Sequence, residues 1–192
     1  MELDNKKFVV DPLMKTGREG MDGLIEYMED CGFFNAPCSG GNHLACEFGL
    51  VHHTRNVMEI AEKMGVCLYG GKEYNKIHDS VIIAAALHDL GKMGQFEKPE
   101  YVDNILASGK KSDSKPFKRN PDLLNVPHEI RSVAIASMFI DLTEEEQFAI
   151  LYHNGLYGPL KYEIQGNETP LYMLIHFADM WASRVIETKK GE

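Results

Sequence analysis

One segment of this chain is apolar on every side of the helix that it predicts. Residues 76–90 have helical character, and their centre reads VIIAAAL. A helix without a polar face has no side suited to contact solvent, so other elements of the same domain must enclose it. The segment therefore predicts a central buried helix, which Gly91 ends.

Several other segments predict helices that can supply this enclosure. Their apolar residues recur three or four positions apart, which is the spacing of one helical face. One of them begins with Thr143 followed by Glu146, the pattern of a capping box. The predicted helices are 18–29, 48–64, one beginning near Pro127, 143–152 and 170–188.

The stretch 92–127 is expected to form a long loop or lid after the central helix. It contains four prolines and little periodicity, and long connections of this kind are often lids or binding loops. A short helix is expected at about 99–107, and a small hairpin farther along near 166–167. The stretch also carries a basic cluster, which is either a solvated loop or a flap that attracts phosphate: Lys110, Lys111, Lys115, Lys118 and Arg119.

Composition limits the partners and the compartment. A formal net charge of −9 disfavours a general binder of long nucleic acid, because phosphate contacts need a basic surface. The N-terminal MELDNKKFVV lacks the apolar core of a secretory signal, and no apolar run approaches membrane-spanning length. The four cysteines are expected to be reduced. These features predict a cytoplasmic protein without a membrane partner, and they leave oligomerisation open.

Ligand-type side chains occupy inward positions or the ends of several predicted helices. His53 and Asp179 share the apolar stripes of their helices, and the pair at 88–89 ends the central helix. A single inward histidine is most simply a hydrogen-bonded core residue. Six such residues together are better explained by a shared metal ion, because buried ionisable groups need partners. The six are His53, His88, Asp89, His128, His153 and Asp179.

At these residues the chain resembles the HD superfamily of metal-dependent hydrolases. The order His, His-Asp, Asp appears in GLVHHTRNV, AALHDLGK and HFADMWASR. The resemblance spans about 42–187 and implies an all-α bundle of about six to eight helices. The sequence shows no repeat and no linker, which predicts a single domain over 1–192, with 1–41 expected as an N-terminal extension packing on the core. The resemblance also implies that His53, His88, Asp89 and Asp179 bind a catalytic metal.

Two more segments resemble a subset of that superfamily. VPHEIRS and YHNG look like the extra ligand segments of dinuclear HD phosphodiesterases, and HLACEFGLVHHT is similar to the HD domain of bacterial 3′-to-5′ exoribonucleases. By resemblance, His128 and His153 hold a second ion that Asp89 bridges. Asn154 departs from the second adjacent histidine of several dinuclear families. One or two ions are therefore expected, and imidazole with carboxylate suits Mn, Fe, Ni or Zn.

Basic residues near the predicted centre are candidates to bind substrate. Lys92 and Arg131 are expected to meet a phosphate and to assist catalysis alongside Asp89, although Lys92 equally suits the end of a helix dipole. His43, in the approach loop, is expected to contact substrate. Lys118 and Arg119 are expected to do so from the basic cluster.

Four functions fit these residues. The leading one is hydrolysis of a phosphate ester of a small phosphorylated substrate, with a nucleotide favoured, by water that a divalent ion activates. The others are a single-strand nuclease or phosphodiesterase, a di-iron HD oxygenase, and a metal-binding regulatory module without turnover.

Overall fold

A bundle of helices around one apolar helix makes up most of the molecule. The structure is a computed structural model, and it describes residues 2–158 and 160–188. It confirms the expected mostly helical fold, to which a two-stranded sheet and three short turns are added. The α-helices of the described residues are α1 (Glu2–Lys15), α2 (Met21–Asp30), α3 (Gly49–Tyr74), α4 (His78–Leu87), α5 (His128–Ala136), α6 (Glu144–Tyr152), α7 (Lys161–Ile164) and α8 (Pro170–Trp181).

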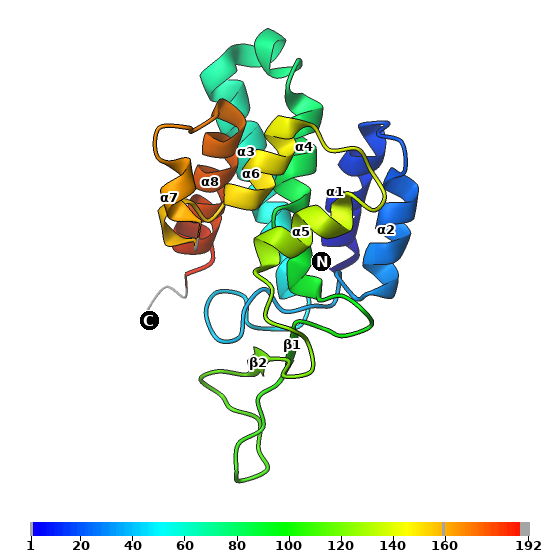
Figure 1. Ribbon diagram of the computed structural model, residues 1–192, viewed down its shortest axis with the longest axis vertical. Helices are drawn as coiled ribbons and strands as arrows, with labels where there is room; N and C mark the ends of the chain where they lie inside the picture. The colour runs from blue at the N-terminus through cyan, green and yellow to red at the C-terminus, as the bar shows by residue number, and fades with distance from the viewer. Residues whose placement is uncertain (1, 159, 189–192) are drawn as a thin grey trace.

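Helix α4 is the predicted central helix. Every residue from Val81 to Leu87 is at most 1% exposed. Helices α3, α6 and α8 pack around α4, and α1 also contacts it (Figure 1). Since interiors are close-packed, this enclosure fixes the end of α4, and with it His88 and Asp89, deep in the bundle.

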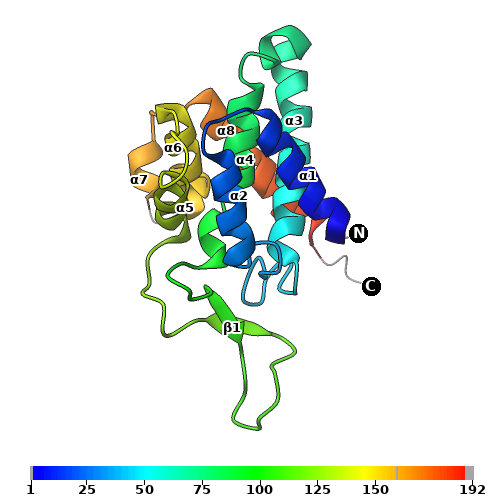
Figure 2. The same ribbon diagram turned by 90° about the vertical axis from the view of Figure 1, so that its right-hand side faces the viewer.

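Helices α1 and α2 lie side by side on the flank of the bundle, where α1 contacts α3 and α4 (Figures 1 and 2). The sequence patterns did not predict α1. Gly20 is the N-cap of α2 and has a φ of +82°. Its backbone passes so close to Phe139 that an added Cβ would lie 1.9 Å from the Phe139 carbonyl oxygen. Only glycine therefore permits this approach.

A buried ion pair joins this flank to α6. Arg18 donates from Nη1 and Nη2 to the two carboxylate oxygens of Glu146, at 2.9 and 2.8 Å. Glu146 is fully buried and also accepts from Ser80 Oγ at 2.8 Å. The predicted capping box is present, because Thr143 N donates to Glu146 and Glu146 N donates to the Thr143 hydroxyl. The Glu146 carboxylate thus accepts hydrogen bonds from three separate segments, through Arg18, Ser80 and Thr143.

The segment after α4 differs from its predicted form. It begins with the 3₁₀ turn η1 (Leu90–Met93), and β1 (Tyr101–Asp103) then pairs antiparallel with β2 (Phe117–Arg119). The predicted helix over 99–107 is therefore wrong, because the aromatic and β-branched residues of β1 bond across the ribbon instead. Both views show this ribbon projecting from the bundle (Figures 1 and 2).

The chain around α7 and α8 also corrects two expectations. The predicted hairpin near 166–167 is wrong: Asn167 N donates to Ile164 O at 2.7 Å, which closes a turn after α7. A 3₁₀ turn, η2 (Gly155–Tyr157), precedes α7. The predicted helix 170–188 is α8 followed by the π-helical turn η3 (Ala182–Ile186). That wider turn changes the direction in which the residues after it point.

The four cysteines are free thiols. Among the residues that the structure describes, no helix combines the length and the apolar character needed to cross a membrane.

Loss of Arg18 is expected to destabilise the fold. Arg18→Ala leaves the buried Glu146 carboxylate without its main counter-charge, which is expected to cost about 1–3 kcal/mol of unfolding free energy. Chemical denaturation measures this. Lys63→Ala is the control, because it breaks an exposed pair with Glu59 and should change stability by no more than about 0.5 kcal/mol. Equal effects of the two variants would contradict a structural role for the buried pair.

The same carboxylate is expected to make stability depend on acid pH. Burial raises the pKa of Glu146, but hydrogen bonds from Arg18, Thr143 and Ser80 outweigh burial and leave that pKa below its ordinary value. Its contribution is therefore present above the unfolded pKa of about 4.3 and is lost as the pH falls through the lowered folded pKa. Glu146→Gln should flatten that acid decline in a pH series of melting temperatures. An unchanged decline would assign it to other groups.

Candidate metal centre

Five helices bring the six predicted ligand residues into one cluster. His53 lies in α3 and Asp179 in α8, while His128 is the first residue of α5. His88 and His153 cap the C-terminal ends of α4 and α6. Asp89 follows His88, and both are buried along with His53 and His153.

The carboxylate of Asp89 lies at the middle of this cluster. Its Oδ2 is 3.4 Å from His53 Nε2 and 3.3 Å from His88 Nε2. Its Oδ1 is 3.1 Å from His128 Nε2 and 3.4 Å from His153 Nε2. Asp179 Oδ1 joins the first set, 3.3 Å from His53 Nε2. The cluster thus has two halves that share Asp89.

A close contact between η1 and α5 positions the His88–Asp89 turn. Ser132 Oγ donates to His88 O at 2.9 Å and accepts from Gly91 N at 2.8 Å. A Cβ at residue 91 would lie 2.3 Å from His128 O. Gly91 therefore does more than end the helix, because its lack of a side chain lets α5 carry His128 up to Asp89.

Hydrogen bonds at the outer nitrogens set the tautomers of the buried histidines. His88 Nδ1 donates to Ala85 O and His153 Nδ1 donates to Ile150 O, both at 2.8 Å. This assignment, made from the hydrogen-bond network, leaves each Nε2 with a lone pair that faces the cluster. Neutral imidazole with a free Nε2 is the form that binds a metal.

The histidine Nε2 atoms and the Asp89 oxygens that face one another are better suited to bind a divalent cation than to hydrogen-bond with one another. His53 Nε2 lies 3.3 Å from His88 Nε2, and His128 Nε2 lies 3.4 Å from His153 Nε2. Asp89 Oδ1 is buried without a hydrogen bond of acceptable geometry, although two imidazoles approach it. Facing lone pairs beside an unsatisfied carboxylate oxygen are stabilised by a cation among them. That these residues bind an ion stays a prediction.

Burial and charge set the protonation of the cluster. Burial lowers the pKa of His88, which favours its neutral form. Burial raises the pKa of Asp89, but the adjacent Lys92 ammonium outweighs burial and holds that pKa well below its ordinary value. An ionised carboxylate and a neutral imidazole are thus adjacent at the end of α4, which is the combination that ligation requires.

Two carboxylates behind the histidines were missed in the sequence. Glu187 lies 3.0 Å from His53 Nδ1 through both oxygens and accepts from Asn56 Nδ2 at 2.9 Å. Glu129 lies 3.4 Å from His128 Nδ1 and accepts from Asn154 Nδ2 at 2.7 Å. A carboxylate that holds the outer nitrogen of a histidine orients the ring and raises its basicity. Glu187 follows η3, whose irregular turn no helical pattern predicts.

Asp179, one of the six clustered residues, lines a cleft of about 880 Å³. His43 and Lys92, both predicted to bind substrate, line this cleft together with Asn154, Asp179 and Arg184. The Lys92 ammonium donates to Asp89 Oδ2 at 2.6 Å. Lys92 therefore contacts one of the predicted metal ligands directly, in addition to any effect of its charge on a helix dipole.

Three other predicted substrate residues are not brought to this cleft. Arg131 is buried, and it donates to Gln95 Oε1 and Leu124 O at 3.0 Å each. These contacts hold the chain between η1 and α5, and the expected catalytic role of Arg131 stays a prediction. Lys118 and Arg119 line a separate hollow beside the ribbon.

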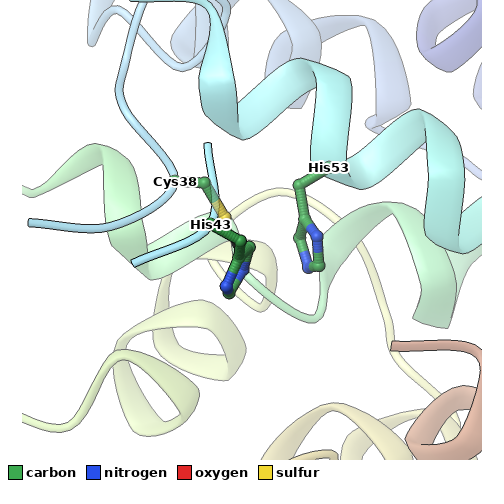
Figure 3. Close-up of side chains that lie close together, drawn as sticks. All are labelled: Cys38, His43 and His53. Atoms are coloured by element: carbon green, nitrogen blue, oxygen red, sulfur yellow. Dashed lines mark hydrogen bonds between the residues drawn. The ribbon is translucent and has the colours of Figure 1, made fainter. Parts of the chain in front are cut away.

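Cys38 and His43 form a group beside His53 (Figure 3). Cys38 Sγ lies 3.4 Å from His43 Nε2. Burial raises the pKa of the Cys38 thiol to about 11, so the sulfur stays protonated at neutral pH. His43 also lines the wall of the cleft.

Comparison with known proteins agrees with this geometry. The chain matches the family model of the HD domain over residues 50–179, which is more than half of its length. It belongs to the HD domain family. Members of this family are generally metal-dependent hydrolases, and all six clustered residues fall within the matched span. No curated protein and no solved structure gave a match.

Glu187 is expected to support metal affinity without being a ligand. Glu187→Gln removes the charge behind His53 and should weaken metal binding about 10–100-fold. Isothermal titration of Mn²⁺ into metal-stripped protein measures this. Glu163→Gln, on the surface of α7, is the matched control. Unchanged affinity in the Glu187 variant would leave its contact with His53 structural only.

Proposed function

We propose that this protein hydrolyses a phosphate ester of a small phosphorylated substrate, with a nucleotide as the favoured class. The observation that carries the proposal is the six-residue cluster, whose Asp179 lines an open cleft. A divalent ion bound there would polarise a phosphoryl oxygen and lower the pKa of water. No side chain is needed as nucleophile, which agrees with the protonated thiol of Cys38.

The residues of the cleft supply contacts for the substrate. Lys92 places a positive charge beside Asp89, where it can bind a phosphate oxygen as a point charge. Burial lowers the pKa of His43, so its ring is neutral and able to exchange hydrogen bonds. Arg184 adds another cation to the lining of the cleft. The cleft volume of about 880 Å³ is in the range of pockets that enclose a small molecule.

Removal of either residue at the end of α4 is expected to abolish metal binding and turnover. His88→Ala and Asp89→Asn each delete a central ligand, so both variants should lose bound metal and phosphatase activity. Elemental analysis and release of inorganic phosphate from a nucleotide panel measure the two losses. Circular dichroism is the structural check, because helical content should be largely unchanged.

The outcome of this assay separates the proposal from other chemistry. Full metal content in the Asp89→Asn variant would refute the ligand assignment. Cleavage inside single-stranded oligonucleotides, with no action on mononucleotides, would assign a nuclease. Oxygen uptake by the iron-loaded protein without phosphate release would assign an oxygenase.

A further inference from the structure

A second hollow lies next to the cleft, between the ribbon and the loop before α3. Its volume is about 470 Å³. It is lined by Gly40, Gly41 and Asn42 of that loop, by Tyr101 and Lys118 of the ribbon strands, and by Lys115. Gly41, Asn42 and Ser114 line both the hollow and the cleft, so the two spaces adjoin.

The hollow is positively charged in a chain whose net charge is −9. Its lining includes Lys115, Lys118 and Arg119 and no carboxylate. Arg119 is neutralised locally, because its Nε and Nη2 bind Glu100 at 2.7 and 2.6 Å. Within the described part of the chain, Lys115 and Lys118 have no such acidic partner, whereas the nearby Lys111 pairs with Asp103 at 2.6 Å.

Hydrogen bonds to backbone carbonyls hold this hollow in shape. Phe117 N donates to Gly40 O at 3.0 Å, and Asn104 Nδ2 donates to Lys115 O at 2.9 Å. A Cβ at Gly40 would lie 2.9 Å from Phe117 O, and one at Gly41 would lie 2.9 Å from Lys115 Cγ. The ribbon thus docks on two glycines, and the lysines extend from a fixed edge.

From this arrangement we infer that the hollow binds a second phosphate of the substrate. This inference rests on the proposed function and narrows its substrate class. The substrate carries one phosphate at the metal centre and another in the hollow that Lys115 and Lys118 line. Nucleoside bisphosphates and short oligonucleotides share this chemistry. Each lysine supplies a charged donor, the type of hydrogen bond that is strongest with phosphate.

Binding to metal-stripped protein tests the inference, because no turnover occurs there. The probes are adenosine 5′-monophosphate, adenosine 3′,5′-bisphosphate and the 5′-phosphorylated dinucleotide of adenosine, titrated calorimetrically at fixed salt. The bisphosphate or the dinucleotide should bind about tenfold or more tightly than the monophosphate. Preference for the bisphosphate assigns a nucleoside bisphosphate, and preference for the dinucleotide alone assigns a short oligonucleotide.

A double variant locates the second phosphate. Lys115→Ala with Lys118→Ala should remove that preference and change monophosphate affinity by less than about twofold. Lys72→Ala with Lys110→Ala makes the same change in net charge outside the hollow and should retain the preference. Equal binding of all three probes to the unmodified protein, or equal weakening of all three by the double variant, would overturn the inference.

The two proposals fail separately. Metal-dependent turnover of the monophosphate without a binding preference would retain the proposed function and reject the second phosphate site. A binding preference without turnover of any phosphate ester would support the phosphate site and reject the hydrolase.

Discussion

The contact between Asp89 and four imidazoles is the interaction on which the arrangement of this protein depends. A carboxylate that is 1% exposed is costly unless cations or donors surround it. Here Lys92 lies against one oxygen, while histidines from α3, α5, α6 and the end of α4 approach both. The burial of α4 creates this requirement, and the helices that enclose α4 also satisfy it.

The outer contacts of the histidines show how the fold prepares those imidazoles. Backbone carbonyls one turn back hold His88 and His153. Carboxylates from distant segments hold His53 and His128. The first pair depends only on the local ends of helices, so it forms wherever α4 and α6 form. The second pair requires η3 and Asn154 to be placed correctly, which couples the ligand geometry to the C-terminal turn and to the loop after α6.

The helices could be predicted from the sequence because the patterns that indicate them involve residues close together in the chain. The VIIAAAL run, the Thr143 capping box and the inward spacing of His53 each depend on a few neighbouring residues, and the structure has α4, α6 and α3 at these places. What escaped prediction depends on distant contacts. The strand pairing of Tyr101 with Arg119 joins residues far apart in sequence, and Glu187 reaches His53 only through a π-helical turn. The partners of Arg131 in the tertiary structure could likewise not be predicted from a local pattern.

The distribution of charge connects the metal centre to the ribbon. Acidic residues dominate the chain and supply its buried carboxylates, so an anionic substrate approaching an arbitrary face is repelled. Lys92 and Arg184 in the cleft and the unpaired lysines of the adjoining hollow form a local exception. Because two glycines let the ribbon dock beside the cleft, these cations line two adjoining spaces. On the proposed function, a substrate with charge at both ends would contact cations in both spaces, whereas a single phosphate would contact only those next to Asp89.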